Sequence, residues 1–332
     1  MTAPAGPLRI LMSRDASAKL GPEVARVLQS RGHVLVAPDE AQAAEADVAF
    51  ISRDITGLST KHRVLPQTQQ VYDALQASRR LQWVHIHSAG ADRPVFVDLR
   101  RRGVQVTTSS GANAAVVAQT ALLGLLALAR HWPRLLQAQR QHRWEPLLAA
   151  GLPRDLQGQT AVIVGWGPVG QALANLLQAL GLNLVVVRRT EGADAGPGIR
   201  TVAPPRLHDV LPGADWLVLA CPLTPQTRNL VGGRELALLP RHAGLVNVAR
   251  GEVVDEEALI EALRDGRLGG AYLDVFATEP LAVESPLWDL PNVIVTPHSA
   301  GFSDGNATRV AQLFLDNLER WIRGAPLLNP VA

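Results

Sequence analysis

A short glycine-rich segment at residues 165–170 constrains the fold of this chain more than any other feature. It reads Gly-Trp-Gly-Pro-Val-Gly, directly follows an apolar run at residues 161–164 and opens a helical pattern at residues 168–180. In such a context the first glycine makes a tight turn, the second lets backbone approach a phosphate, and the third lets helix and strand pack closely. The helix start also offers N–H groups and a partial positive charge. The segment therefore predicts a dinucleotide site at Gly165, Gly167, Pro168, Val169 and Gly170.

Short apolar runs alternate with longer helical patterns along the chain, which is typical of parallel sheets covered by helices. A first series predicts strands at residues 8–12, 34–37, 48–52, 83–87 and 104–107, with helices at 21–30 and 72–78. A second series predicts strands at residues 161–164, 183–187, 200–202, 216–220, 244–248, 271–275 and 293–296, with a helix at 256–265. A long apolar helix at residues 114–130 connects the two series, with Trp132 and Pro133 at its end, and an amphipathic helix at 306–323 closes the chain.

These two series predict an α/β protein with two Rossmann-like, doubly wound parallel-sheet domains. The length of 332 residues suits two domains of ordinary size. Residues 1–107 and 300–332 are predicted to form a flavodoxin-like substrate domain, also called the catalytic domain. Residues 108–299 are predicted to form the nucleotide-binding domain, inserted into the first.

Composition excludes several classes of protein. With 47% hydrophobic and 19% charged residues, the chain can bury a large core, which argues against disorder. The balance of 32 basic against 30 acidic residues gives no general attraction to nucleic acid or anionic membranes. The most apolar stretch, residues 112–129, is interrupted by Asn113, Gln119 and Thr120, so it is interpreted as a buried helix. A single cysteine, Cys221, and the lack of a signal-peptide pattern at residues 1–7 lead us to expect a cytoplasmic protein.

Polar residues follow several predicted strands where each strand ends. Arg250 follows the strand at residues 244–248, Asp274 and Glu279 come at and after the end of the next strand, and His298 follows the last strand. Ligands bind outside the carboxyl ends of strands in open parallel sheets. A guanidinium can grip a carboxylate, and a histidine held by a carboxylate can protonate a carbonyl oxygen, so these residue types suit a keto acid beside a nicotinamide. Spacing alone also allows Arg250 to be a surface charge and Glu279 to be a turn residue.

Other patterns lead to simpler interpretations. His85 and His87 share one side of a predicted strand, but the sequence shows no third ligand nearby, so no metal site is predicted. The run of three arginines at residues 100–102 has no interleaved aromatic residues and is interpreted as a solvated face. His142 and Trp144 follow the long helix and either shape the substrate pocket or line a subunit interface.

The chain resembles the D-isomer-specific 2-hydroxyacid dehydrogenases over nearly its whole length. The segments that carry the resemblance lie in the order of that family at residues 88–92, 165–170, 221–227, 247–251, 273–276 with 279–280, and 296–301. The resemblance implies an NAD(P)-dependent oxidoreductase that reduces a small 2-keto acid to the D-2-hydroxy acid or runs the reverse reaction, with glyoxylate and hydroxypyruvate as favoured substrates. It also implies a homodimer with its interface at residues 112–144.

The same resemblance implies roles for individual residues. Arg250 would bind the substrate carboxylate and polarise the carbonyl, while His298 would be the general acid in reduction, oriented by Glu279. Ser88 and the backbone amides of Ala89 and Gly90 would help to hold the carboxylate. Asp274 would meet the nicotinamide carboxamide. The same resemblance places Thr224 in the turn that borders the cofactor. The other predicted cofactor contacts are Arg188, Arg189, Thr190, Cys221, Pro222, Thr227, Val248, Ala249 and His298.

Two positions depart from the family pattern. Gln119 stands where relatives commonly carry Glu, which affects a local helix contact and not the chemistry. The residue that ends the second strand of the nucleotide fold is acidic in many NAD-dependent members, whereas here Arg188 is followed by Arg189 and Thr190. These side chains donate hydrogen bonds that suit a 2′-phosphate, so NADP is the predicted cofactor and NAD the alternative.

The main alternative is a nucleotide-sensing regulatory protein of the corepressor type, which uses the same fold without physiological turnover. A formate dehydrogenase is disfavoured because Glu279 stands where that branch is expected to carry Gln. An amino-acid dehydrogenase or a hydrolase on a similar fold would need a lysine near the carbonyl, and the only lysines, Lys19 and Lys61, lie outside the predicted site.

Overall fold

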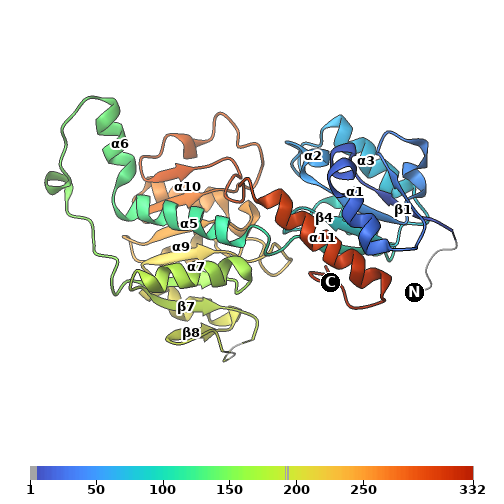
Figure 1. Ribbon diagram of the computed structural model, residues 1–332. Helices are drawn as coiled ribbons and strands as arrows, with labels where there is room; N and C mark the ends of the chain where they lie inside the picture. Colours follow the sequence, from blue (N-terminus) through green and yellow to red (C-terminus); the bar gives the residue numbers. More distant parts are fainter. Residues whose placement is uncertain (1–5, 191, 193, 332) are drawn as a thin grey trace. The chain divides into compact units, whose positions relative to one another are not determined.

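The computed structural model describes residues 6–190, 192 and 194–331, and the chain divides into two compact units (Figure 1). The first unit runs to Asn113 and resumes at Ser303, and the second is Ala114–Phe302. The predicted boundaries differ from this division at residues 108–113 and 300–302. Ala112 belongs to the first unit because its side chain is buried in that core and its carbonyl accepts a hydrogen bond from Nε of Arg309. Ala300 belongs to the second unit, where its amide donates to Asp274.

The first unit is built on a sheet of five parallel strands in the order β2-β1-β3-β4-β5, which is the flavodoxin-like order. One face of the sheet is covered by helices α1 and α11, and Figure 1 shows the returning helix α11 beside α1. Helices α3 and α4 cover the other face. The elements are β1 (Leu8–Leu11), α1 (Arg14–Leu28), β2 (His33–Val36), β3 (Val48–Ile51), α2 (Arg53–Thr56), α3 (Pro66–Ala77), β4 (Trp83–Ile86), α4 (Pro94–Arg101), β5 (Gln105–Thr108) and α11 (Asn306–Ile322).

Helix starts in this unit differ from the sequence prediction. Helix α1 begins at Arg14, well before the predicted start at residue 21, because the Ser13 side chain caps it by accepting from the amide of Ala16. Pro22 lies inside this helix. Helix α3 begins at Pro66 rather than at residue 72, since proline suits the first turn of a helix. Helix α4 had no counterpart in the predicted pattern.

The second unit is built on a sheet of seven parallel strands in the order β12-β11-β10-β9-β6-β7-β8. The direction of strand addition reverses between β6 and β9, and ligands bind at such a switch point in open α/β sheets. The elements are α5 (Ala114–Ala129), α6 (Trp132–Arg140), β6 (Thr160–Val164), α7 (Pro168–Ala179), β7 (Asn183–Val187), β8 (Ile199–Val202), α8 (Leu207–Val210), β9 (Trp216–Leu219), α9 (Gly233–Leu238), β10 (Gly244–Asn247), α10 (Glu256–Arg264), β11 (Gly270–Leu273) and β12 (Val293–Val295).

Both faces of the seven-stranded sheet are buried, as expected of a parallel sheet between two helix layers. Ala161 and Ile163 of β6 pack with α5 and α7, whereas Val162 and Val164 face the layer that contains α8, α9 and α10. On β11, Tyr272 faces the α5 side and its neighbours face the other layer. Helix α5 therefore covers the strands from which the predicted catalytic loops emerge.

Helices α5 and α6 meet at a bend of 72°. His131 lies at the bend in the left-handed region with φ of 54°, and Trp132 and Pro133 open α6 instead of ending the long helix. In Figure 1, α6 and the segment after it extend away from the sheet of the second unit. Among the described residues, no single helix has the length and hydropathy of a membrane span, although this bent pair passes that test as two pieces.

Candidate active site

The predicted site residues of the second unit gather at one edge of its sheet. Because all seven strands are parallel, their carboxyl ends share that edge. The predicted residues follow β6, β7, β9, β10, β11 and β12, so every one of these strands delivers a loop to the same edge.

The glycine-rich turn connects β6 to α7. Gly165 has φ of 107°, and a Cβ there would lie 2.7 Å from the carbonyl oxygen of Ala220 and from the amide of Cys221. A Cβ on Gly170 would lie 2.2 Å from the carbonyl oxygen of Gly165. Side chains at these two positions would push the turn away from the neighbouring loop or from its own helix, so only glycine allows this packing.

Gly167 differs from the other two glycines and provides the fit for a phosphate. It is exposed, and no protein atom lies within 4 Å of the place where its Cβ would be. Helix α7 begins at Pro168, directly after Gly167, and the first amides of a helix have no partner within the helix. Open space beside these amides and the positive end of the helix form a cradle that fits a pyrophosphate.

The segment after β7 lies next to this turn and contains the predicted donors to a 2′-phosphate, Arg188, Arg189 and Thr190. The carbonyl of Val187, the last residue of β7, accepts a hydrogen bond from the amide of Gly165 at 3.0 Å. Arg188 follows at once, and its Nη1 donates to the carbonyl of Asp194 at 3.4 Å. Arg189 and Thr190 are exposed. The backbone that follows β7 beside the glycine-rich turn therefore carries two arginines, and the guanidinium of Arg188 lies at the carbonyl of Asp194.

The loop after β9 forms a compact turn on the other side of the glycine-rich segment. The hydroxyl of Thr227 donates to the carbonyl of Pro222 at 2.7 Å and accepts from the amide of Thr224, also at 2.7 Å. Cys221 is buried, and burial raises the pKa of its thiol to about 11. The thiol therefore stays protonated near neutral pH and acts as packing against the turn.

Arg250 is held at the end of β10 by its neighbours. The buried Asn247 side chain accepts from the amide of Ala249 and donates to the carbonyl of Arg250. A Cβ on Gly251 would lie 1.8 Å from the carbonyl carbon of Phe276, so the loop after β10 touches the backbone of the loop after β11. The contact brings the Arg250 loop against the loop that carries Glu279. Val248 and Ala249 lie in the same turn, half-buried and buried respectively.

Glu279 and His298 form a hydrogen-bonded pair. Nδ1 of His298 lies 2.8 Å from Oε2 of Glu279, and the other carboxylate oxygen accepts from the amide of Phe276 at 3.2 Å. Burial by itself raises the pKa of Glu279, but the hydrogen bond and charge of His298, the Phe276 amide and the charge of Arg250 together lower it below its usual value. Glu279 is therefore an ionised acceptor, and His298 donates to it from Nδ1. This leaves Nε2 of the half-exposed imidazole for a reacting group.

Asp274 has a different environment from Glu279. Its side chain is 2% exposed, and its carboxylate accepts from the Thr296 hydroxyl and from the amides of Ser299 and Ala300. Burial raises the pKa of Asp274, although these hydrogen bonds oppose the shift. The described contacts of the Asp274 carboxylate are thus with the loop that carries His298. Its contact with a nicotinamide carboxamide stays a prediction.

The predicted carboxylate-binding residues lie in the first unit, after β4. The Ser88 hydroxyl donates to the carbonyl of Gly90 at 2.8 Å, and Ala89 is exposed. Just before them, His85 is fully buried, with Nδ1 2.8 Å from the Thr107 hydroxyl and Nε2 3.0 Å from the Ser109 hydroxyl. His87 contacts the Thr56 hydroxyl through Nε2. Among the described residues, no group of three or more metal-ligating side chains could hold a metal ion.

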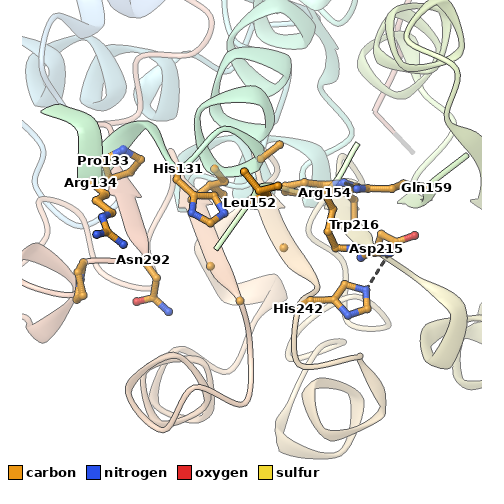
Figure 2. Close-up of a pocket in the computed structure, with 16 residues that line it drawn as sticks. His131, Pro133, Arg134, Leu152, Arg154, Gln159, Asp215, Trp216, His242 and Asn292 are labelled. Atoms are coloured by element: carbon orange, nitrogen blue, oxygen red, sulfur yellow. Dashed lines mark hydrogen bonds and ion pairs between the residues drawn. The ribbon is translucent and has the colours of Figure 1, made fainter. Parts of the chain in front are cut away.

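A cavity of about 370 Å³ lies at the opposite, amino-terminal edge of the same sheet (Figure 2). Its wall includes Trp216 and Gly244, the first residues of β9 and β10. Figure 2 shows His242 beside Asp215, with Nε2 2.8 Å from the carboxylate. The loops after β10, β11 and β12 emerge from the other ends of these strands, so this cavity is not the candidate active site.

Four residues that sequence reasoning gave no role support this edge of the sheet: Asn247, Gly251, Tyr272 and Thr296. Asn247 is a buried polar residue at a strand end, and Gly251 directly follows the predicted substrate arginine. Those two signals could have identified them. Thr296 opens the segment 296–301 that carries the family resemblance, and that was its signal. Tyr272 has no comparable signal, because an aromatic residue is ordinary in a strand.

Comparisons with known proteins identify the proteins to which this chain is similar. Residues 122–300 match the family model described as the D-isomer-specific 2-hydroxyacid dehydrogenase, NAD-binding domain. A glyoxylate reductase of Thermococcus gammatolerans is 37% identical over 249 residues, which cover 72% of this chain and 72% of that protein. A glyoxylate/hydroxypyruvate reductase of Arabidopsis thaliana is 32% identical over 271 residues, covering 80% of each chain.

Solved structures extend the likeness to the whole fold. A D-isomer-specific 2-hydroxyacid dehydrogenase of Xanthobacter autotrophicus, in complex with NADPH and MES, is similar with a TM-score of 0.78 and 30% identity, over 99% of this chain and 98% of that one. An NADPH-dependent glyoxylate/hydroxypyruvate reductase of Sinorhizobium meliloti in complex with NADP gives a TM-score of 0.75 and 26% identity, over 98% of each chain. The chain belongs to the D-isomer-specific 2-hydroxyacid dehydrogenases, a family of oxidoreductases that use a nicotinamide cofactor.

Proposed function

We propose that this enzyme reduces glyoxylate or hydroxypyruvate to the corresponding 2-hydroxy acid, with NADPH as its preferred hydride donor. The observation that carries the proposal is the 2.8 Å contact between Nδ1 of His298 and Oε2 of Glu279, at the sheet edge that also holds Arg250 and the glycine-rich turn. The named activities of the Thermococcus and Arabidopsis relatives support the choice of substrates.

The protein's own residues supply binding and the proton. Arg250 binds the substrate carboxylate through its guanidinium, a contact that is charge-assisted and directional. Ionised Glu279 accepts from Nδ1, which favours the imidazolium form of His298 and directs Nε2 toward the substrate. Nε2 then gives its proton to the carbonyl oxygen in reduction and takes it back in oxidation. The nicotinamide, when bound, supplies or accepts the hydride at the substrate carbon.

The preference for NADPH rests on the residues that follow β7. Arg188 and Arg189 place two cations where an acidic residue would repel a 2′-phosphate, and the Thr190 hydroxyl adds a donor. NADPH or NADP is also the nucleotide named for the Xanthobacter and Sinorhizobium structures. NAD remains usable in this proposal, because it lacks only the phosphate contacts.

We also propose a homodimer that uses helices α5 and α6 and the segment after them. Leu123 on α5 is 66% exposed, and Trp132 and Trp144 are 51% and 97% exposed. Leu148 and Leu152 continue this exposed apolar series. Apolar side chains that are exposed together in one region are typical of an interface. Light scattering after size exclusion should give twice the mass of the chain, and Leu123→Arg should shift the mass toward that of one chain.

Steady-state assays test the reaction and the cofactor together. A panel of 2-keto acids with NADPH or NADH should give the highest kcat/KM for glyoxylate or hydroxypyruvate with NADPH. The double variant Arg188→Ala and Arg189→Ala should raise KM for NADPH much more than KM for NADH. A higher wild-type kcat/KM with NADH would refute the cofactor preference. Tight nucleotide binding without turnover of any keto acid would instead support a nucleotide-sensing regulatory protein.

A further inference from the structure

We propose that Tyr272 and Thr296 are positioning residues for His298, that they act through the buried carboxylate of Asp274, and that helix α5 holds this network in place. The inference rests on the proposed role of His298 as the general acid. In their described contacts, Tyr272 and Thr296 reach His298 through Asp274, and the network lies within the second unit.

The hydrogen bonds of the network run in one direction. The Thr296 hydroxyl donates its single proton to Oδ1 of Asp274 at 2.7 Å. The Tyr272 hydroxyl lies 2.8 Å from the same threonine oxygen, so it must be the donor in that contact. Because Tyr272 is on β11 and Thr296 follows β12, the chain of donors joins two neighbouring strands and ends on a carboxylate. Such chains strengthen one another in a low-dielectric interior.

Asp274 connects these hydrogen-bond donors to the backbone of His298 and of the two residues that follow it. The amide of His298 donates to the carbonyl of Asp274 at 2.8 Å, and the amides of Ser299 and Ala300 donate to its carboxylate. His298 itself has φ of 50°, in the left-handed region that costs a non-glycine residue energy. A conformation of this kind persists only where the surroundings hold it. The network therefore holds the backbone of His298 in this conformation, and the backbone sets the position of the imidazole.

Helix α5 supports the network at two points. A Cβ on Gly124 would lie 2.2 Å from the ring of Tyr272, so the helix backbone packs directly against the face of this ring. The Thr120 hydroxyl, one turn earlier on the helix, shares its single proton between the carbonyls of Val116 at 3.1 Å and Ala300 at 3.2 Å. Burial of Tyr272 raises the pKa of its phenol, which keeps the donor protonated. The helix thus fixes both the first donor of the chain and the loop after His298.

The charged groups around His298 predict how the network influences its proton. Glu279 contacts Nδ1, Arg250 acts on Glu279, and the charge of His298 lowers the pKa of Asp274. By reciprocity the charge of Asp274 favours the protonated imidazole. Removing the Thr296 donor would let burial raise the pKa of Asp274 further, so Asp274 would lose its charge at higher pH. Where Asp274 is uncharged, its support for the protonated imidazole is lost, so the alkaline fall in the rate of reduction should begin at lower pH.

The two tyrosines of the chain allow a matched experiment on the phenol. Tyr272→Phe removes one hydroxyl from the network and should lower kcat for reduction about 3- to 30-fold, with KM for the keto acid changed less than about twofold. Tyr72→Phe removes the same group from the first unit, where it accepts from Nη1 of Arg93, and should leave kcat unchanged. A Tyr272→Phe enzyme with the wild-type kcat would overturn the proposal.

Thr296 provides the second arm, with rescue by a conservative variant. Thr296→Val keeps the shape but removes the hydroxyl, and should lower kcat about 10- to 100-fold and move the alkaline fall in reduction to lower pH. Thr296→Ser retains the donor and should recover most of both losses. If Val and Ser behave alike, or if only the urea midpoint changes while the pH profile stays fixed, the residue has a merely structural role and the proposal fails.

His298→Ala separates this inference from the proposed function. If that variant retains full reductase activity, the assignment of the acid is wrong and the positioning network has nothing to position. If His298→Ala is inactive while Tyr272→Phe and Thr296→Val have wild-type pH profiles, the assignment of the acid stands and the network is refuted. Thr120→Val tests the contribution of α5 and should lower kcat less than Thr296→Val does.

Discussion

Two carboxylates near one histidine have pKa shifts of opposite sign, and this difference separates their roles at the scale of single residues. Asp274 is almost wholly buried and burial raises its pKa, while His298, the Phe276 amide and the charge of Arg250 together outweigh the burial of Glu279 and lower its pKa. Glu279 is thus the charged partner of the acid. Asp274 holds the backbone from which the acid projects.

Replacing Arg250 should affect both binding and chemistry if its guanidinium grips the carboxylate and polarises the carbonyl. Arg250→Ala should raise KM and lower kcat together, a loss of about 2–4 kcal/mol, or roughly 30- to 1000-fold in kcat/KM. Arg250→Lys keeps the charge but loses the planar pair of N–H donors, and should recover only part of the loss. Steady-state kinetics with the favoured keto acid measure this. An Ala variant within about threefold of the wild type would contradict the assignment.

Replacing Glu279 should move the pH dependence of reduction. Because the charge of His298 helps to lower the pKa of Glu279, the ionised carboxylate favours the protonated imidazole by the same energy. Reduction needs that proton, so its rate falls as pH rises, and in Glu279→Gln this fall should begin at lower pH. His298→Ala should lose about 10²- to 10⁴-fold in kcat with little change in nucleotide affinity. A profile of kcat against pH that the Glu279 change leaves in place would argue against the pairing.

At the scale of elements, adjacent strands account for the candidate site. β10, β11 and β12 are neighbours in the sheet, and each places one loop with a predicted catalytic residue at the same edge. Contact between backbones fixes the distance between two of these loops, because Gly251 lies against Phe276. A second contact, from the Ala277 amide to the Glu256 carboxylate at 2.9 Å, joins the Glu279 loop to α10.

The contact at Gly251 predicts a large effect from one methyl group. Gly251→Ala would place Cβ within 1.8 Å of the Phe276 carbonyl carbon, so the loops that carry Arg250 and Glu279 must separate. We expect kcat/KM to fall about 100-fold or more, since a displacement of about 1 Å can cost that much. Gly213→Ala is a suitable control, because no atom lies within 4 Å of its Cβ position and its φ is not in the left-handed region. Equal activity of the two variants would show that the loops tolerate separation.

At the scale of the whole molecule, the two units differ in how acid should affect them. In the first unit, burial lowers the pKa of His85 to about 3, and burial with nearby cationic groups lowers that of His87 to about 3. Among the described residues of the second unit no histidine is buried. A histidine with a lowered pKa in the folded state contributes stability that is present above about pH 6.5 and is lost as pH falls toward 3.

The first unit should therefore unfold more readily in mild acid. At about pH 4.5, His85 alone should cost roughly 2–3 kcal/mol of folding free energy relative to pH 7. Urea unfolding followed by circular dichroism at pH 7.0, 5.5 and 4.5 measures the change. His85→Gln retains hydrogen-bonding groups without a titrating proton, and its stability should depend less on pH. An unchanged pH dependence in this variant would place the acid sensitivity elsewhere.

Local patterns in the sequence determined the parallel α/β class, the strands and the position of the glycine-rich turn. These features depend on neighbouring residues and on periodicity, as at residues 161–170. The family resemblance added roles for Arg250, Glu279 and His298, but spacing along the chain could not show whether they meet. Only the tertiary structure placed β10, β11 and β12 side by side, brought Glu279 within 2.8 Å of His298, and set Tyr272 against α5. The reason is that these contacts join segments far apart in the chain, and long-range packing selects them while no local pattern encodes them.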